Sequence, residues 1–500
     1  MKDANIANTD GAQGQKRSAC ATRRFWRAGL AAVTISTLWC ADTGAQSAAP
    51  AGPPAARASE TRSGQDAFER RLHDLETQIA ALRSEIDRMR STNGSAAPAI
   101  ARVDDLERQV QALTVEIERL RIGEAATPPA KTIVPGFGPA ASKVYGVKKG
   151  VSIGGYGDML YQTYTRTRDD DTPSNAVDTL DLDRAVLYFG YKFNDRFLFN
   201  SEVEYEHAVV AADKPEGETS VEFAYVDFKA TRRFGVRCGL LLVPVGFLSE
   251  LHEPPIFFGA RRSEVEQRII PSTWRENGAG VYGEAGPVSY RVYLVAGLDG
   301  AGFTPDEGIR EGRQEGAGSK INDAALTARI DVTPVAGLRL GAAAFTGRTG
   351  QGDPAQPRSR LTLWEVHGEW NWRGLHARGL YARTILTDAG AVSLAIDGSG
   401  TTAIGERMTG WYGELAYNLL ATVRKTDQEL SLFCRYESLN TQDRVAPGFT
   451  ADPANDLTVK TCGAHYRPIP NVVIKLDAQD FDNKAHTAVD QVNLALGYLF

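Results

Sequence analysis

Charged side chains crowd the segment between residues 244 and 276 in a pattern that suits anion binding. The segment contains the arginines Arg261, Arg262, Arg268 and Arg275, with Glu264, Glu266 and Glu276 among them. An arginine guanidinium is planar, makes paired hydrogen bonds to phosphate or carboxylate oxygens, and keeps its proton at ordinary pH. If the fold confines this segment, its arginines can guide or hold small anions.

Other cationic residues alternate with apolar neighbours in extended segments. Because successive side chains of a β-strand point to opposite faces, these cations are expected on one polar, inward face. They are Arg184, Lys192, Arg329, Arg339, Arg435 and Lys475. At each single position, a solute-binding role competes evenly with a simpler one, in which mixed charges only solvate a polar interior.

Three glutamates work against an anion path. Glu202, Glu204 and Glu206 share one face, and apolar residues such as Phe199 occupy the other, so the carboxylates are expected to line the same interior. They repel an anion unless cations neutralise them, for example Arg184 on the neighbouring segment.

The elements that must position these residues are β-strands. From about residue 147 onward, alternating segments of about ten residues follow one another to the end of the chain. Short connections such as 194–196 and 373–374 alternate with long ones such as 244–276. Short turns at one end, long loops at the other and about sixteen strands are typical of a transmembrane β-barrel. A soluble β-sandwich or propeller does not require this alternation of connection lengths.

Aromatic residues near strand ends agree with a membrane barrel, whose interfacial girdles are aromatic. They include Tyr188, Tyr191, Phe193, Trp370, Trp372, Tyr498 and Phe500. The last strand, VNLALGYLF, must pair with the first to remove the open edges of the sheet. Its aromatic residues Tyr498 and Phe500 are predicted to be the signal read by the barrel-assembly machinery.

Composition excludes other classes. The net charge of −6 argues against a nucleic-acid-binding protein. A mean hydropathy of −0.29 and the lack of long apolar runs after the N-terminus argue against a bundle of membrane helices. No Ser/His pair has a recognisable catalytic spacing, so we expect no enzyme and no cofactor. GAGVYG (278–283) leads into a strand and LHEPP lacks a second histidine, so neither indicates a nucleotide or zinc site. RDDDTPSN (168–175) reads as a solvated acidic loop.

Two stretches are similar to a known family. DRAVLYFGYKFNDRFLFNSEVEYE (183–206), with Arg184 at the strand start, and the segment 236–284, which contains VPVGF before a long arginine-bearing loop, resemble the phosphate-selective porin O and P family. The resemblance covers about residues 147–500. It implies an outer-membrane porin that passes small anions, phosphate among them. The segment 244–276 is the third long connection, which commonly folds into the lumen of a sixteen-stranded porin. We therefore expect a trimeric porin with Arg261, Arg262, Arg268 and Arg275 at its constriction.

The residues before the barrel fall into four predicted zones. Residues 1–45 are expected to form a secretory signal peptide, with a basic flank before a short apolar run. An Ala/Pro/Gly-rich disordered spacer (46–64), a coiled-coil segment (65–122) and a Pro/Gly linker (123–146) follow. The barrel domain is predicted to span 147–500.

The heptad pattern of 65–122 needs a partner for its apolar seam. Either copies from three chains associate in parallel, which we favour, or the two helices fold back on each other. A second function follows from this zone: a periplasmic coiled coil that tethers the outer membrane to peptidoglycan or to a periplasmic protein. Lipid and lipopolysaccharide are the other expected partners of a barrel.

Cys238, Cys434 and Cys462 remain after removal of the predicted signal. An odd number without a CxxC motif argues against a zinc site or a disulfide framework, although one pair could bridge in an oxidising compartment.

Overall fold

The computed structural model describes residues 54–92, 102–103, 105–111, 113–114, 134, 136–209, 217–398, 400–423 and 426–500. The predicted signal peptide (1–45) lies outside the described residues. So does most of the stretch from 112 to 135.

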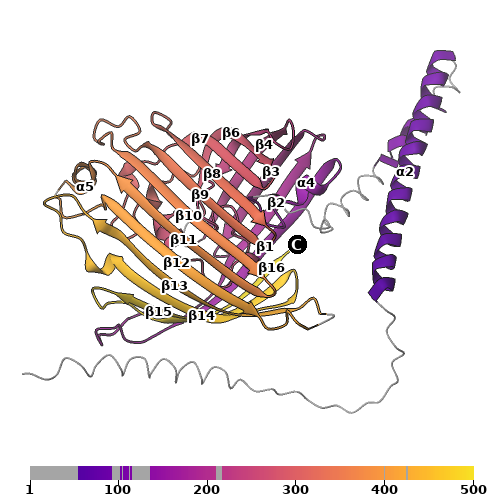
Figure 1. Cartoon of the computed structure of the whole chain (residues 1–500). Helices are drawn as coiled ribbons and strands as arrows, with labels where there is room; N and C mark the ends of the chain where they lie inside the picture. The colour runs from indigo at the N-terminus through magenta and orange to yellow at the C-terminus, as the bar shows by residue number, and fades with distance from the viewer. Residues whose placement is uncertain are drawn as a thin grey trace, which may run out of the picture. The chain divides into compact units, whose positions relative to one another are not determined.

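Sixteen antiparallel strands form one closed barrel, in which every strand pairs with its neighbours in sequence and β1 pairs with β16 (Figure 1). The predicted fold class, a transmembrane-type barrel of about sixteen strands, is confirmed. The strands are β1 Gly150–Tyr164, β2 Thr179–Lys192, β3 Phe197–Glu206, β4 Glu218–Lys229, β5 Gly235–Leu242, β6 Arg275–Ala285, β7 Val288–Ala296, β8 Ala324–Val335, β9 Leu338–Arg348, β10 Arg360–Trp372, β11 Leu375–Leu386, β12 Arg407–Asn418, β13 Glu429–Arg444, β14 Asp456–Ile469, β15 Val472–Asn483 and β16 Gln491–Leu499.

Short turns join the strands at one end of the barrel, which we call the turn end, and longer connections join them at the other, the loop end. The largest connection at the loop end is 243–274, and the smallest turns include 286–287 and 373–374. The predicted alternation has two exceptions in the structure: 419–428 is long for a turn, and 484–490 is short for a loop.

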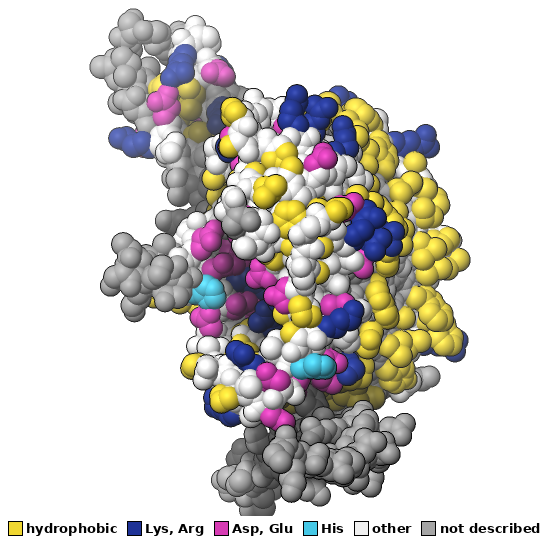
Figure 2. Space-filling model, turned by 90° about the vertical axis from the view of Figure 1, so that its left-hand side faces the viewer, with side chains coloured by type: hydrophobic (Ala, Val, Ile, Leu, Met, Phe, Trp, Pro, Cys, Tyr) yellow, Lys and Arg dark blue, Asp and Glu magenta, His cyan; other side chains and the backbone are white. Residues whose placement is uncertain are grey.

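The two-residue period of the strands separates an apolar outside from a polar inside. In β16, Leu494, Leu496 and Tyr498 are outward and exposed, whereas Asn493 is fully buried in the lumen. Figure 2 looks onto the loop end and shows hydrophobic side chains covering one flank of the barrel. The prediction that Tyr188 belongs to the outward aromatic girdle is wrong. Tyr188 is buried in the lumen, where its ring stacks against Phe223.

The remaining elements are helices and helical turns. They are α2 Pro54–Thr92, α4 Lys143–Gly146, α5 Ala389–Asp397, η1 Pro254–Ile256, η2 Val265–Ile269, η3 Gly300–Gly302, η4 Arg310–Gly312 and η5 Pro453–Asn455. Helix α2 begins inside the range predicted to be a disordered spacer (46–64). Within the described part of the chain, no helix is long and apolar enough to cross a membrane.

Two helical stretches of the predicted coiled-coil zone contact each other within the chain. Arg90 at the end of α2 forms an ion pair of 2.5 Å with Glu107. The apolar seam residues Leu75, Ile86 and Leu106 are buried. Within one chain, these two helical stretches therefore lie against each other. The parallel association of three copies stays a prediction.

Cys434 on β13 lies directly opposite Cys462 on β14, and the two form a disulfide. Cys238 is a free, exposed thiol. The pairing was left open by the sequence, because only the strand register brings two distant cysteines into opposition.

Candidate functional site

The loop between β5 and β6 (243–274), called the inner loop below, lies inside the barrel. Its contacts reach three walls of the lumen: Arg329 of β8 donates to the carbonyl of Gly246, and Tyr412 of β12 donates to the Glu266 carboxylate at 2.6 Å. On β15, Lys475 Nζ donates to the Gly259 carbonyl at 2.8 Å. A segment that bonds to all these strands must cross the lumen.

Apolar side chains hold the inner loop in place. Val245, Phe247, Phe257, Ile269 and Trp274 are all nearly or fully buried, and they belong to one hydrophobic cluster with inward residues of the strands. Burying each such side chain contributes roughly 1.5–3 kcal/mol. The loop is therefore a packed part of the barrel interior.

The four arginines of the predicted constriction differ in their partners. Arg268 pairs with Glu264 at 2.9 Å, and Arg275, at the start of β6, pairs with Glu222. Arg262 donates to the hydroxyl of Thr273 at 2.9 Å. Among the residues that the structure describes, no carboxylate lies within 4.0 Å of the Arg261 or Arg262 guanidinium.

Five of the six cations predicted on the strands face inward and are already bonded inside the protein. The sixth, Lys192 at the turn end of β2, is partly exposed, and its side chain forms no ion pair among the described residues. Arg184 pairs with Asp158 at 2.9 Å, Arg329 with Asp331 at 2.8 Å, Arg339 with Glu369 at 2.6 Å and Arg435 with Glu437 at 2.6 Å. The Lys475 ammonium lies 3.6 Å from the centre of the Phe257 ring. Most of their charge is thus compensated locally, which weakens their pull on a passing anion.

The three glutamates of β3 also face inward. Glu202 is fully buried and bonds to His252 of the inner loop at 3.0 Å. Glu204 lies 3.9 Å from Arg184, the cation expected to neutralise it, but Asp158 is the closer partner of that arginine. Glu206, at the loop end of the strand, is half-buried.

Sequence reasoning missed the wall carboxylates that pair with these arginines. Two of these carboxylates could have been predicted from the sequence. Asp331 and Glu437 stand two residues after Arg329 and Arg435, so each shares a strand face with its arginine. Asp158 and Glu222 could not have been predicted, because only the register between strands brings them to their arginines.

A polar cavity of about 320 Å³ opens at the loop end, and we call it the vestibule. Figure 2 shows acidic and basic side chains gathered in a hollow of this face. Its charged lining consists of six carboxylates and four guanidiniums: Glu204, Glu206, Glu218, Glu222, Glu311, Glu315, Arg262, Arg275, Arg310 and Arg313. Arg310 donates to the Ser272 carbonyl at 2.7 Å and so ties the loop 297–323 to the inner loop.

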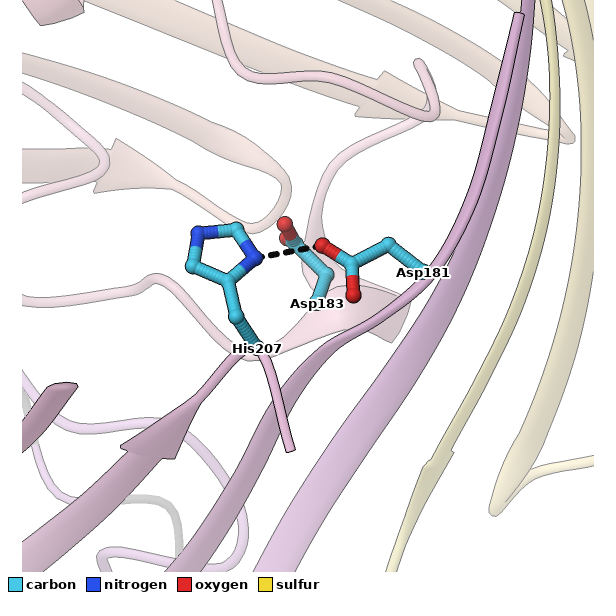
Figure 3. A group of neighbouring side chains, drawn as sticks. All are labelled: Asp181, Asp183 and His207. Atoms are coloured by element: carbon cyan, nitrogen blue, oxygen red, sulfur yellow. Dashed lines mark hydrogen bonds and ion pairs between the residues drawn. The ribbon is translucent and has the colours of Figure 1, made fainter. Parts of the chain in front are cut away.

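Beside β2 and β3, at the loop end, Asp181, Asp183 and His207 lie together (Figure 3). Their ligand atoms lie within 4.8 Å of one another, and such a set can hold a divalent cation. His207 Nδ1 is, however, already hydrogen-bonded to Asp181, and this bond raises the pKa of the imidazole. The cluster is therefore satisfied as an ion pair.

Residues 136–146 lie inside the lumen near the turn end, although they were predicted to belong to a linker (123–146). Phe137 and Val144 are buried among inward residues of the strands. The Glu253 carboxylate of the inner loop accepts hydrogen bonds from the backbone N–H groups of Ala140 at 3.0 Å and Ala141 at 3.1 Å. We call residues 136–146 the plug segment.

The fold and the lumen define a class: an outer-membrane-type β-barrel of porin-like architecture, with a long loop folded inside. No family model matches the chain. The resemblance to the phosphate-selective porin O and P family thus stays a prediction. The chain is 38% identical over 372 residues to an uncharacterized protein of Aquifex aeolicus (strain VF5), covering 73% of this chain and 83% of that protein. It belongs to the same family as that protein.

Two solved structures are similar to this chain at low sequence identity. The loop L8 deletion mutant of OmpT, an outer membrane protein of Vibrio cholerae, is 12% identical over 71% of this chain and 100% of that chain, with a TM-score of 0.46. OmpF of Salmonella typhi, in a complex with daunomycin, is 12% identical over 71% of this chain and 98% of that chain, with a TM-score of 0.47.

Proposed function

We propose that the protein is an outer-membrane porin, a passive diffusion channel for small charged solutes with a modest preference for anions. The observation that supports it best is the closed barrel with an apolar outside and a charged lumen narrowed by the inner loop. A membrane-spanning barrel removes every open strand edge, and a charged interior has use only where water and solutes enter.

The anion preference rests on fewer residues than the sequence suggested. Arg261 and Arg262 lack a carboxylate partner among the described residues, and Arg262 lines the vestibule. Ion-paired arginines such as Arg275 contribute less, because an adjacent carboxylate cancels much of their field. Six carboxylates in the vestibule oppose anions, so the preference is expected to be modest. Phosphate belongs to the proposed class of solutes as one small anion.

The reversal potential of the reconstituted protein under a potassium chloride gradient tests this function. We expect a wild-type channel with anion preference, a weaker preference in Arg261→Ala/Arg262→Ala, and no change in the control Arg444→Ala, which removes an exposed arginine paired with Glu406. Block of the current by added phosphate would show that phosphate is bound. Cation preference in the wild type would refute the arginine assignment, and absence of any conductance would refute the channel.

A further inference from the structure

Four arginines form a row on the outside of the barrel at the loop end. They come from four neighbouring strands: Arg348 ends β9, Arg360 begins β10, Arg383 lies near the end of β11 and Arg407 begins β12. Arg348 stands directly opposite Arg360, and Ile385, two residues after Arg383, stands opposite Arg407. We call these residues the outward arginine row.

The alternation of burial shows that the row faces away from the lumen. Leu361 follows Arg360 and is fully buried, and Ala382 and Thr384 on either side of Arg383 are fully buried as well. Because neighbouring strand positions point to opposite faces, the arginines point outward. Figure 2 shows Lys and Arg side chains bordering the hydrophobic flank.

Three members of the row lack a counterion within the part of the chain that the structure describes. Among the described residues, no carboxylate lies within 4.0 Å of the guanidiniums of Arg348, Arg360 or Arg383, whereas Arg407 is bonded to Asp443. Like charges directly opposite each other destabilise a strand pair, so the Arg348–Arg360 pair is unfavourable without an external anion. Lys460, which also points outward from the barrel, does have a counterion within the chain: Asp480 on the facing strand, at 3.1 Å.

Aromatic residues surround Arg383. Its guanidinium lies 5.9 Å from the ring centre of Trp364 and 5.7 Å from that of Tyr381, and it donates to the Tyr381 hydroxyl at 2.6 Å. Its Nε is buried and has no hydrogen-bond partner among the described residues. Tryptophan and tyrosine collect at the level of lipid headgroups in membrane proteins. The row therefore stands at the height where the phosphate groups of a lipid lie.

A groove of about 450 Å³ lies on this face. Arg383, Arg407, Tyr381 and Trp411 line it, together with polar and acidic residues of β13 and β14. The two carboxylates of the lining are already paired, Asp443 with Arg407 and Asp456 with Lys484. On the same flank, exposed Val366 and Leu415 belong to the apolar surface. A ligand with an anionic head and apolar chains matches this combination, because each part meets a surface of its own kind.

We infer that the outward arginine row binds the phosphate groups of a phosphorylated glycolipid in the outer leaflet of the membrane. Guanidiniums pair with phosphate oxygens through two parallel hydrogen bonds, and a phosphate between Arg348 and Arg360 would relieve their repulsion. The acyl chains would cover the apolar flank. This inference rests on the proposed location in the outer membrane, but not on conduction or on its selectivity.

Lipid A binding to the purified full-length protein in micelles tests the inference. The probes are lipid A with its phosphates and dephosphorylated lipid A, and binding is followed by native mass spectrometry. We expect the variant Arg348→Gln/Arg360→Gln/Arg383→Gln to bind phosphorylated lipid A at least about tenfold more weakly than the wild type. The wild type should bind the dephosphorylated form as weakly as that variant binds lipid A.

A matched control removes three loop-end cations that have carboxylate partners: Arg166→Gln/Lys320→Gln/Lys460→Gln. It loses the same formal charge and should bind lipid A like the wild type. Equal binding by the wild type and the row variant would overturn the inference. Inorganic phosphate that displaces lipid A at equal concentration would make the row a free-anion site, and dissociation of an oligomer in the row variant would make it a subunit interface. Either result would also overturn it.

Conductance of the same proteins in planar bilayers separates this inference from the proposed function. Loss of lipid binding with unchanged conductance would support the lipid site and leave the channel intact. A wild type that binds lipid A through the row but does not conduct would refute only the channel.

Discussion

Arginines on the strands that form the lumen wall have counterions in the chain, whereas three of the four arginines in the outward row have none among the described residues. Arg184, Arg329 and Arg435 in the lumen each have a carboxylate within 3.0 Å, whereas Arg348 and Arg383 on the outward face have none among the described residues. A charge enclosed by protein must find its counterion in the same chain, since an unpaired buried charge is costly. A charged side chain at the membrane border can instead have its counterion on another molecule. The presence or absence of a carboxylate counterion thus separates arginines that stabilise the barrel from arginines that are available to bind a ligand.

Removal of an internal counterion should have the largest effect. Asp331 accepts hydrogen bonds from Arg329, Arg291 and His367. In Asp331→Asn, Arg329 would stay buried without a full counterion, at a cost of roughly 3–5 kcal/mol in the free energy of unfolding. Urea unfolding in micelles, followed by tryptophan fluorescence, measures the loss. Arg383→Gln is the control on the outside of the barrel and should unfold nearly like the wild type. An equal loss of unfolding free energy in both variants would show that inner and outer arginines do not differ in this way.

A third kind of buried charge is the Glu253 carboxylate of the inner loop, which accepts hydrogen bonds from backbone N–H groups of the plug segment. Burial raises the pKa of Glu253 from an ordinary 4.5 to about 7, although its bonds to Ala140 and Ala141 and the neighbouring His252 act the other way. Departure of the plug segment would hydrate the carboxyl and return its pKa toward 4.5. The closed arrangement therefore binds more protons, and Glu253 favours closure less as the pH rises from 4.5 to about 7.

We therefore expect conductance to rise severalfold between about pH 5 and about pH 8, with most of the change below pH 7. The Glu253→Gln variant, which cannot ionise, should lose this part of the pH dependence. Single-channel recording at constant ionic strength measures both. A wild-type conductance that falls over this range would show that the carboxylate holds the segment more strongly than burial opposes its charge.

The outward row itself should show a smaller effect. In lipid-free micelles, Arg360→Gln removes one of two like charges that face each other across β9 and β10. The barrel should become more stable by roughly 0.2–1 kcal/mol. The gain should shrink in high salt, which screens exposed charges. Urea midpoints at low and high salt check it, and destabilisation by the substitution would indicate an internal partner for Arg360.

The smallest effect concerns the exposed pair His207–Asp181. The hydrogen bond to Asp181 is the main cause of the raised pKa of His207, and Asp183 adds to it by its charge. Asp181→Asn should lower this pKa, and Asp183→Asn should lower it less. An NMR titration of the imidazole measures both. Because the folded pKa is raised, the pair stabilises the protein below the ordinary histidine pKa of 6.5 and loses this contribution as pH rises through the folded value.

The barrel could be predicted from the sequence because its signal is local. A strand such as β16 shows its two faces within nine residues, and the lengths of neighbouring connections indicate which end of the barrel each one occupies. The inward direction of Arg329 and Arg435 follows from the same period. Sixteen strands of this kind leave few alternatives to a closed barrel.

The partners of the arginines could not be predicted, because they depend on register between strands. Arg184 meets Asp158 only since β1 and β2 align these two positions. The plug segment was missed for another reason: its proline and glycines suggested a linker, although Phe137 and Val144 are apolar enough to be buried. The heptads of 65–122 showed that a partner was needed without showing whether it comes from the same chain.

The pairing of β1 with β16 has a consequence for the order of events during folding. Across this seam, the Gln162 amide donates to the Asn493 amide oxygen at a sequence separation of 331 residues, whereas the other strand pairs join neighbours in the chain. Contacts between distant residues close the largest loops and form slowly. Until the seam closes, both outer strands expose unpaired backbone groups to other chains. The interval before closure is therefore the period in which the chain is most prone to aggregate, and a factor that shields these two edges would shorten the exposure more than any gain in stability of the finished barrel.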